Sequence, residues 1–255
     1  MEIAIITGAS SGLGKEFVEA VLDKYRSLDE IWLIARRKER MEELAAFYPN
    51  QNFRILPLDL SVEESFVEFV RQLKEHKPLV KLLINNAGLA ISGPFREADI
   101  LKQVQMASLN MLAPMILCNL TLDYMQNGKS NIINVCSVSA FAPTLNQVTY
   151  SATKSFLLNF SRGLREELKD SGINVLALCP GKMATEMLGN PQKQTAHLSA
   201  QAFLPFLDTK KLTRQSLRLV EQGRGVYTPG LAYKAYRAIA KAIPHDIIMK
   251  FSKVQ

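Results

Sequence analysis

Apolar runs of strand length recur along the chain and are separated by segments with helical spacing. The runs are rich in Ile, Leu and Val and do not alternate with polar residues, as expected of strands buried on both faces. The repeated order of strand and helix predicts a parallel sheet with helices on both faces and right-handed crossovers. We therefore expect a doubly wound α/β fold whose strands are residues 3–7, 31–35, 53–58, 80–85, 131–137 and 173–179.

Helical patterns fill the intervals between these runs. One begins at Gly12, one begins near Lys38, and one begins at Ser61, where Glu64 three residues later completes a capping-box pattern. Longer helical patterns occupy residues 97–127 and 148–170. Since no internal repeat, low-complexity tract or linker divides the chain, we expect residues 1–255 to form a single domain.

Composition and cysteine usage narrow the class of protein. With 47% hydrophobic and 22% charged residues, the chain has the composition of an ordinary globular protein. Its three cysteines and three histidines are scattered without a Cys-x-x-Cys pair, so we expect buried free thiols and no metal site. The first residues have the pattern of a strand, not of a secretion signal, and no run reaches the roughly 18 apolar residues of a membrane span. The expected location is the cytoplasm.

The net charge of +7 is concentrated near the C-terminus. Residues 209–255 contain ten Lys and Arg but only two acidic residues. For the basic amphipathic extension at residues 229–255, three interpretations remain open: a solvated helix packed on the domain, contact with an anionic membrane surface or charged substrate, and a subunit contact. Nucleic acid is not an expected partner, because no recognised binding module accompanies the charge.

A glycine-rich turn follows the first strand, in the stretch "TGASSGLGKEF". Gly8, Gly12 and Gly14 stand between a strand and a helix, where glycine permits positive φ and lets backbone N–H groups approach a pyrophosphate at the helix N-terminus. The spacing is Gly-x-x-x-Gly-x-Gly, and a plain tight turn is the alternative. The neighbouring strand and helix favour a dinucleotide site.

The end of the second strand indicates which dinucleotide binds. "LIARRKER" places Arg36 and Arg37 where an acidic residue usually holds the ribose hydroxyls of NAD. A guanidinium binds a 2′-phosphate through two parallel hydrogen bonds, so NADP(H) is favoured over NAD(H). Ser11, inside the turn, adds a hydroxyl donor. The alternative is that both arginines only solvate the start of a helix.

"YSATKSF" places Tyr150 and Lys154 four residues apart, on one face of a helix. Alone, this pair could be ordinary helix surface. With the glycine turn in place, the chain resembles the short-chain dehydrogenase/reductase family over nearly its whole length. The resemblance rests on these motifs, in order: TGxxxGxG at Thr7–Gly14, "DLS" at Asp59–Ser61, "NNAG" at Asn85–Gly88, Asn110 in "SLNMLAP", Ser137 thirteen residues before Tyr150, Tyr-x-x-x-Lys, and "PG" at Pro180–Gly181 followed by Thr185.

This resemblance implies an NADP(H)-binding Rossmann domain with an active site. The implied catalytic residues are Asn110, which would hold a proton-relay water through its helix, and Ser137, Tyr150 and Lys154. Lys154 would also bind the nicotinamide ribose. The candidate cofactor-binding residues are Gly8, Ser10, Ser11, Gly12, Leu13, Gly14, Arg36, Asp59, Leu60, Asn86, Gly88, Tyr150, Lys154 and Thr185.

Carbonyl reduction requires residue types of this kind. Hydride transfer builds negative charge on the carbonyl oxygen, to which Ser137 can donate a hydrogen bond and Tyr150 a proton. A free phenol has a pKa near 10, and an ammonium about 4 Å away contributes on the order of 4 kcal/mol at an effective dielectric of 20. We therefore expect Lys154 to lower the pKa of Tyr150 by up to about three units, before desolvation opposes the shift.

Several of these residues have simpler explanations. Asp59 could be a strand-end cap, Asn86 could be a turn residue, and Ser139 competes with Ser137 for the serine role, although its spacing to Tyr150 disfavours it. Lys182 departs from the family, which usually has an apolar residue after "PG". Its ammonium could attract an acidic substrate, but we expect it to face solvent.

Substrate preference is expected to come from residues 182–215, which would form a substrate lid. The part from Met183 to Phe206 is rich in Met, Leu and Phe, which indicates a hydrophobic carbonyl compound or secondary alcohol, such as a steroid, a retinoid-like lipid or an acyl chain; half of these residues could instead be core. The expected function is an NADP(H)-dependent oxidoreductase, for example a hydroxysteroid dehydrogenase. A membrane-associated lipid ketoreductase and a non-catalytic NADP(H) sensor are the alternatives. The resemblance implies a homodimer or homotetramer.

Overall fold

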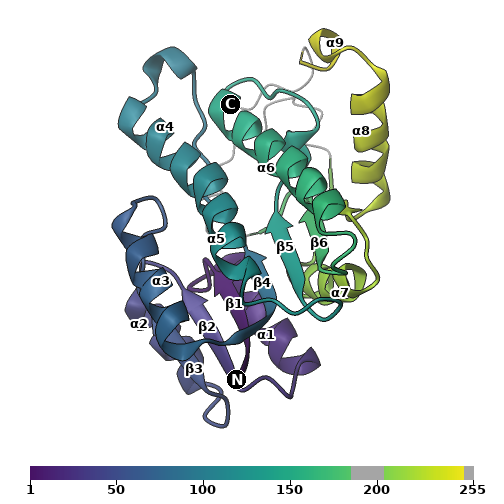
Figure 1. Ribbon diagram of the computed structural model, residues 1–255. Coiled ribbons are helices and arrows are strands. Elements are labelled where there is room, and N and C mark those ends of the chain that lie inside the picture. The colour runs from purple at the N-terminus through teal and green to yellow at the C-terminus, as the bar shows by residue number, and fades with distance from the viewer. Residues whose placement is uncertain (185–203, 250–255) are drawn as a thin grey trace.

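The computed structural model describes residues 1–184 and 204–249. Its centre is a sheet of parallel strands in the order β3-β2-β1-β4-β5-β6-β7 (Figure 1). The strands are β1 (Glu2–Thr7), β2 (Glu30–Ile34), β3 (Phe53–Leu56), β4 (Leu79–Asn85), β5 (Asn131–Val135), β6 (Asn174–Leu178) and β7 (Val226–Tyr227). The doubly wound α/β fold is confirmed, and the six predicted strands form at the expected places.

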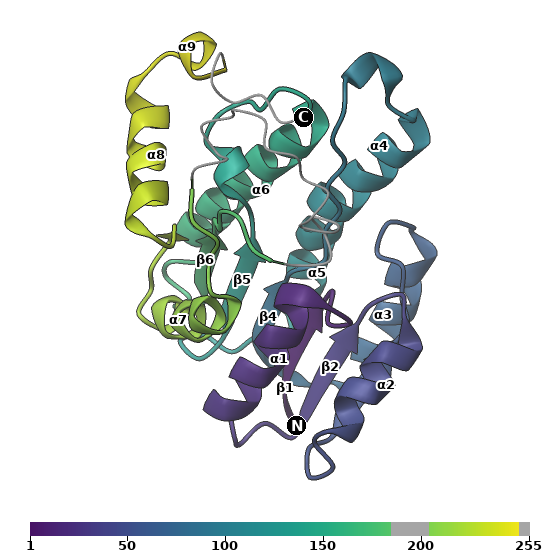
Figure 2. The same cartoon turned by 180° about the vertical axis from the view of Figure 1, so that it is seen from behind.

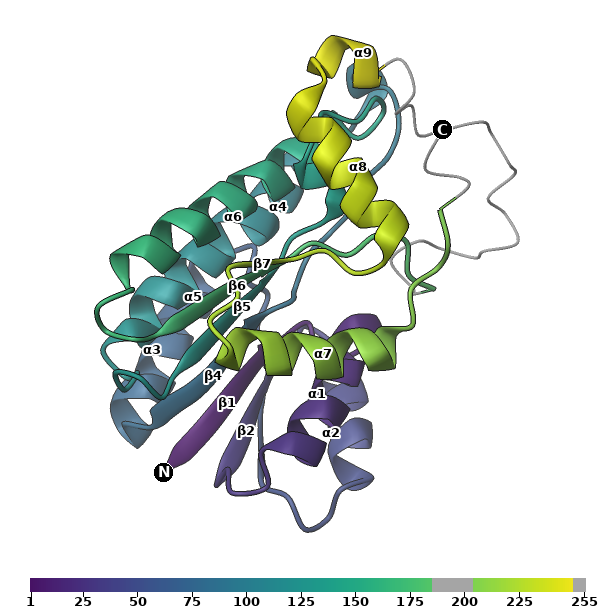
Figure 3. The same ribbon diagram turned by 90° about the vertical axis from the view of Figure 1, so that its right-hand side faces the viewer.

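Helices cover both faces of the sheet. On one face lie α3 (Glu64–His76), α5 (Ala113–Leu122) and α6 (Val148–Glu167), and on the other lie α1 (Gly12–Lys24), α2 (Lys38–Ala46) and α7 (Thr209–Glu221) (Figures 2 and 3). The central strands pack against the helices on both faces. In β1, Ile3 and Ile5 pack towards α3 and α5, while Ala4 and Ile6 pack towards α1 and α7. Burial on both faces explains why the apolar runs do not alternate with polar residues.

The direction of chain winding reverses between β1 and β4, which are neighbours in the sheet. Loops leaving the carboxyl ends of these two strands turn to opposite faces and open a crevice between them. The glycine turn follows β1, and Asn86 follows β4. The fold therefore brings these two sequence motifs to one point, although they are about 80 residues apart.

The structure differs from the prediction in the start of one helix and in the continuity of another. The capping box at Ser61 is wrong: α3 begins at Glu64, and the Ser61 hydroxyl donates to the Asp59 carboxylate over 2.6 Å instead. The helical pattern at 97–127 is divided. It consists of α4 (Ile100–Ala107), a π-helical turn at Ser108–Leu112 and then α5.

By length and composition alone, the described helical stretch Ile100–Leu122 could cross a membrane, with a mean hydropathy of 1.2. This stretch is not an uninterrupted apolar run, because Lys102 and several Gln, Ser and Asn residues divide it. Buried core helices pass the same test, and the second half of this stretch is one of them. Leu117 and Cys118 of α5 are 1% exposed and pack against the sheet.

The C-terminal part of the described chain packs beside β7. After α7, the short strand β7 leads to α8 (Leu231–Ala242) and α9 (His245–Met249). α8 buries Tyr233 and Ala240 and leaves its opposite side exposed. This agrees with an amphipathic helix packed on the domain. All three cysteines are free and buried, as expected.

Candidate active site

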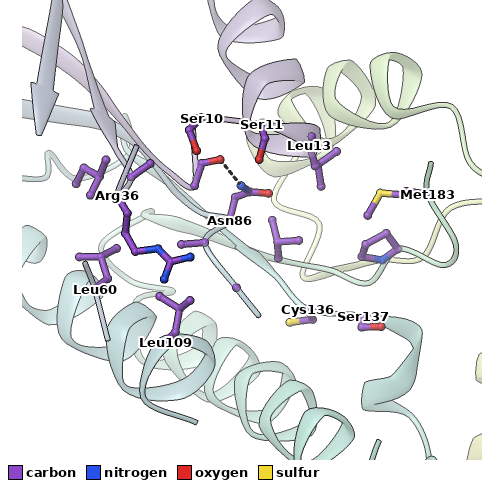
Figure 4. A pocket seen from close by; sticks show the side chains of 18 of the residues that line it. Ser10, Ser11, Leu13, Arg36, Leu60, Asn86, Leu109, Cys136, Ser137 and Met183 are labelled. Atoms are coloured by element: carbon purple, nitrogen blue, oxygen red, sulfur yellow. Dashed lines mark hydrogen bonds between the residues drawn. The ribbon is translucent and has the colours of Figure 1, made fainter. Parts of the chain in front are cut away.

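A cleft lies along the carboxyl ends of β1, β4 and β5. Figure 4 shows Arg36, Leu60 and Leu109 towards one end, the serines of the glycine turn along one wall, and Ser137 and Met183 towards the other end. Thirteen of the candidate catalytic and cofactor-binding residues line it: Gly8, Ser10, Ser11, Gly12, Leu13, Arg36, Asp59, Leu60, Asn86, Gly88, Ser137, Tyr150 and Lys154.

The glycine turn is as tight as its sequence indicates. Gly8 and Gly12 have φ angles of 68° and 52°, in the left-handed region where glycine is favoured. Gly14 lies behind the cleft wall, where a Cβ would overlap the carbonyl oxygen of Gly8. Ser11 caps α1 in an extended conformation, so the first N–H groups of α1 lie beside the cleft. Such a turn suits a bound phosphate.

Asn86 holds the turn to the end of β4. Its side-chain amide donates to the carbonyl oxygen of Thr7 over 2.9 Å, and its backbone N–H donates to the Thr7 hydroxyl over 2.9 Å. The same hydroxyl accepts a second bond from the N–H of Ala87. Asn86 is therefore more than an ordinary turn residue, because it fixes the two sides of the crevice relative to each other.

Two arginines and a carboxylate lie at the β2 end of the cleft. The Arg37 guanidinium donates to the hydroxyls of Ser10 and Ser11 over 3.1 and 2.8 Å. Arg36 extends into the cleft, and its Nη1 is 3.9 Å from Oδ2 of Asp59. Asp59 also accepts from the N–H and hydroxyl of Ser61, so it caps its own turn while facing the cleft. This arrangement collects hydroxyl and guanidinium donors at one place.

Tyr150, Lys154 and Ser137 meet at the opposite end. Lys154 is 5% exposed, and its ammonium donates to the carbonyl oxygen of Val135 over 2.9 Å. Its Nζ is 5.9 Å from the centre of the Tyr150 ring. Ser137 accepts a bond from the N–H of Ser139, which is itself buried behind the cleft wall. Of the two serines, Ser137 is the one that lines the cleft.

The expected direction of the Tyr150 pKa shift is wrong. Burial raises the pKa of the Tyr150 phenol, and a hydrogen bond with Ser137 opposes this only in part. Burial also lowers the pKa of the Lys154 ammonium. The expectation assumed a separation of about 4 Å between the two groups, whereas the structure directs the ammonium towards the Val135 carbonyl. Desolvation, which disfavours both charged forms, is therefore the larger effect.

Asn110 lies in the π-helical turn and is 1% exposed. Its side-chain oxygen accepts from the N–H of Leu89, and its amide donates to the Leu89 carbonyl and to the Thr153 hydroxyl. Thr153 stands next to Lys154 on α6. Asn110 thus joins the loop after β4 to the helix that carries Tyr150 and Lys154, from a position just behind the cleft wall.

The remaining wall comes from the loop after β6. Pro180, Gly181 and Met183 line the cleft there, whereas Thr185 lies outside the described residues, as does most of the expected lid. Lys182 is half-buried, and burial lowers the pKa of its ammonium. Met183, which belongs to the expected lid, lines the cleft, and so does Cys136, which was not among the candidate residues. The position of Cys136 next to Ser137 was the available signal.

The residues present fit a dinucleotide phosphate. The turn has the close backbone approach that glycine permits, the β2 end collects cationic and hydroxyl donors, and the far end presents a phenol, a hydroxyl and an ammonium to one space. These are the groups needed at the pyrophosphate, at a 2′-phosphate and at a reacting carbonyl.

The sequence profile of the short chain dehydrogenase family matches residues 2–196, and the chain belongs to this family. An uncharacterised oxidoreductase of Staphylococcus saprophyticus is 29% identical over 193 residues, covering 74% of this chain and 81% of that protein.

Solved structures agree over a longer stretch. A short-chain dehydrogenase from Sphingobium yanoikuyae in complex with NADPH is 28% identical, with a TM-score of 0.78 over 95% of this chain and 94% of the other. A bulky-bulky ketone specific alcohol dehydrogenase from Comamonas testosteroni is 29% identical, with a TM-score of 0.76 over 95% and 92%.

Proposed function

We propose that the protein is an NADP(H)-dependent oxidoreductase that interconverts a hydrophobic ketone and its secondary alcohol. One observation carries the proposal: the Tyr150, Lys154 and Ser137 group lines the same cleft as the glycine turn and Arg36. A non-catalytic NADP(H) sensor has no need of the first group. Hydroxysteroids are one substrate class of the required kind.

NADP(H), when bound, supplies or accepts the hydride. At the other reactant, the Ser137 hydroxyl donates a hydrogen bond to the carbonyl oxygen, and Tyr150 delivers its phenolic proton as that oxygen becomes an alkoxide. Lys154 would hold the ribose hydroxyls of the bound cofactor, and Asn110 joins the loop after β4 to α6. Lys154 and Ser137 are largely buried at this end, at 5% and 8% exposed.

A preference for NADP(H) is supported by Arg36 and Arg37. The nearby carboxylate is that of Asp59. The Arg36 guanidinium offsets part of its negative charge, and the Ser61 hydroxyl already donates to one of its oxygens. The Sphingobium relative was solved with NADPH. A hydrophobic substrate is supported by Met183 in the cleft wall near Ser137, and a ketone by the substrate named for the Comamonas relative.

The test compares cofactors and substrates in one assay. Arg36→Ala is expected to weaken NADPH binding about 10- to 100-fold, as befits loss of charge-assisted hydrogen bonds to a phosphate, and to change NADH binding little. Binding is measured by calorimetry, and turnover by NADPH absorbance with ketosteroids, aldehydes and β-ketoacyl compounds. Equal losses for both cofactors would contradict the NADP(H) assignment, and no turnover with any carbonyl would contradict the activity.

A homodimer or homotetramer is the proposed assembly. α4 leaves Ile100, Leu101 and Val104 between 55% and 76% exposed, and a second copy would bury them.

A membrane-associated lipid ketoreductase is the second candidate function. It is favoured by α8, which exposes Leu231 (83%) and Ile239 (49%) on the same helix as the exposed Lys234 and Lys241.

A further inference from the structure

Tyr233 connects α8 to the loop after β6. Its side chain is 1% exposed and is among the largest fully buried ones in the described part of the chain. The ring packs so closely on Gly181 that a Cβ at that position would overlap three ring atoms. The glycine of "PG" is therefore required by α8, because only a residue without a side chain leaves room for the ring.

The Tyr233 hydroxyl forms two hydrogen bonds, both with backbone groups. It accepts from the N–H of Lys182 over 3.0 Å and donates to the carbonyl oxygen of Pro205 over 2.9 Å. Burial raises the pKa of Tyr233, so the hydroxyl remains protonated and keeps its donor through neutral and mildly alkaline pH.

The backbone held by Tyr233 forms the end wall of the cleft. The carbonyl oxygen of Lys182 accepts from the N–H of Leu207 over 2.8 Å, and Met183 pairs with Leu207 as an isolated bridge. The carbonyl oxygen of Pro180 accepts from the N–H of Val138, the residue after Ser137, over 2.9 Å. A displacement of this backbone would therefore move Gly181 and Met183 relative to Ser137.

We propose that Tyr233 is a positioning residue for the reactive end of the cleft. It holds the backbone from Gly181 to Met183 in place at the end of the cleft that Ser137 and Tyr150 also line, where the nicotinamide half of the cofactor would bind. This inference rests on the proposed function. It assigns α8 a role in the site that is separate from its exposed basic face, and it assigns no proton or hydride transfer to Tyr233 itself.

The experiment compares Tyr233→Phe with Tyr236→Phe. Both changes remove one buried hydroxyl from α8, but the Tyr236 hydroxyl has no hydrogen-bond partner within the described structure. Calorimetry measures binding of NADPH and of adenosine 2′,5′-bisphosphate, a fragment without the nicotinamide half. For Tyr233→Phe, which removes both hydrogen bonds of the hydroxyl, we expect the Kd of NADPH to rise about five- to tenfold, while the Kd of the fragment stays unchanged. For Tyr236→Phe we expect no change in either Kd.

Tyr233→Leu, which also removes the ring, is expected to weaken NADPH binding further and again to spare the fragment. Thermal unfolding of each variant identifies any general loss of stability. Unchanged NADPH affinity in Tyr233→Phe would overturn the inference, as would parallel losses for NADPH and the fragment, which a loosened fold would produce. If the wild type bound no NADPH, the proposed function would fail, and this inference with it.

Discussion

At the scale of single residues, burial sets the direction of the pKa shifts of Tyr150 and Lys154 in the candidate active site. Partial burial raises the pKa of the Tyr150 phenol, and burial lowers the pKa of the Lys154 ammonium. A raised pKa keeps the phenol protonated throughout the neutral range. Tyr150 is therefore prepared to donate a proton, which carbonyl reduction requires, whereas alcohol oxidation requires the phenolate.

The two directions of the reaction should therefore respond differently to pH. We expect kcat for ketone reduction to be nearly constant between about pH 6 and 8, because the phenol stays protonated below its raised pKa. We expect kcat for alcohol oxidation to rise up to about tenfold per pH unit through the alkaline range, because the phenolate fraction grows until the phenol has titrated. Both profiles are measured by NADPH absorbance.

Tyr150→Phe provides the control for these profiles. It should reduce kcat by about 10²- to 10⁴-fold, the usual contribution of a positioned acid, with little change in the Kd of NADPH. The alkaline rise in oxidation should disappear with the hydroxyl. A Tyr150→Phe enzyme that keeps the wild-type profile would show that another group supplies the proton.

At the scale of elements, long apolar strands were predictable from sequence and features made by distant contacts were not. β1, β4 and β5 are buried runs with clear ends, so their positions follow from the pattern. β7 has only two residues and forms because Val226 and Tyr227 pair with β6, which no local pattern reveals. The π-helical turn at Ser108–Leu112 lies in a largely apolar stretch, and its partner Leu89 belongs to another loop.

In the candidate active site too, local motifs could be predicted from the sequence and distant contacts could not. The glycine turn and the Tyr-x-x-x-Lys pair are local motifs, so their residues could be named from sequence. The bonds from Arg37 to the serines of the turn, and the direction of the Lys154 ammonium, depend on neighbours from other strands. For that reason a Coulombic effect at an assumed distance gave the wrong sign for the Tyr150 pKa shift, and the dominance of burial was missed.

The close packing of α1 on β1 gives a prediction at this scale. Gly14→Ala should lower the free energy of unfolding by about 1–3 kcal/mol or more, because the added Cβ would overlap the Gly8 carbonyl oxygen and push α1 away from the turn. NADPH binding should weaken as well, since the turn would be displaced. Urea unfolding followed by circular dichroism measures the first effect, and calorimetry the second.

Gly163→Ala is the matched substitution. Gly163 lies on the exposed side of α6, and a Cβ added there would meet no atom of the described residues within 4 Å, so alanine should raise the free energy of unfolding by about 0.5–1 kcal/mol. The two glycine-to-alanine changes should thus have opposite signs. If Gly14→Ala proved as stable as the wild type, the close contact between α1 and the turn would be refuted.

At the scale of the whole molecule, α8 separates two roles on its two sides. Its buried side fixes Tyr233 against the cleft wall, and its exposed side combines lysines with apolar residues. Truncating the chain before α8 would therefore damage the site as well as the surface. Charge reversal at Lys234 and Lys241, both exposed, tests the surface alone because the Tyr233 contacts are left intact.

If α8 contacts an anionic membrane, binding should depend on lipid charge. We expect the wild type to co-sediment with vesicles containing phosphatidylglycerol, less so at high salt, and weakly with pure phosphatidylcholine. Lys234→Glu with Lys241→Glu should lower the partition coefficient about 30-fold or more, since each lysine contributes about 1 kcal/mol near such a surface. The matched control reverses Lys129 and Lys169, exposed lysines at the amino end of the sheet, and should partition like the wild type. Equal partitioning of all three proteins, or no dependence on lipid charge, would refute membrane binding by α8. The remaining interpretations would be packing on the domain and subunit contact.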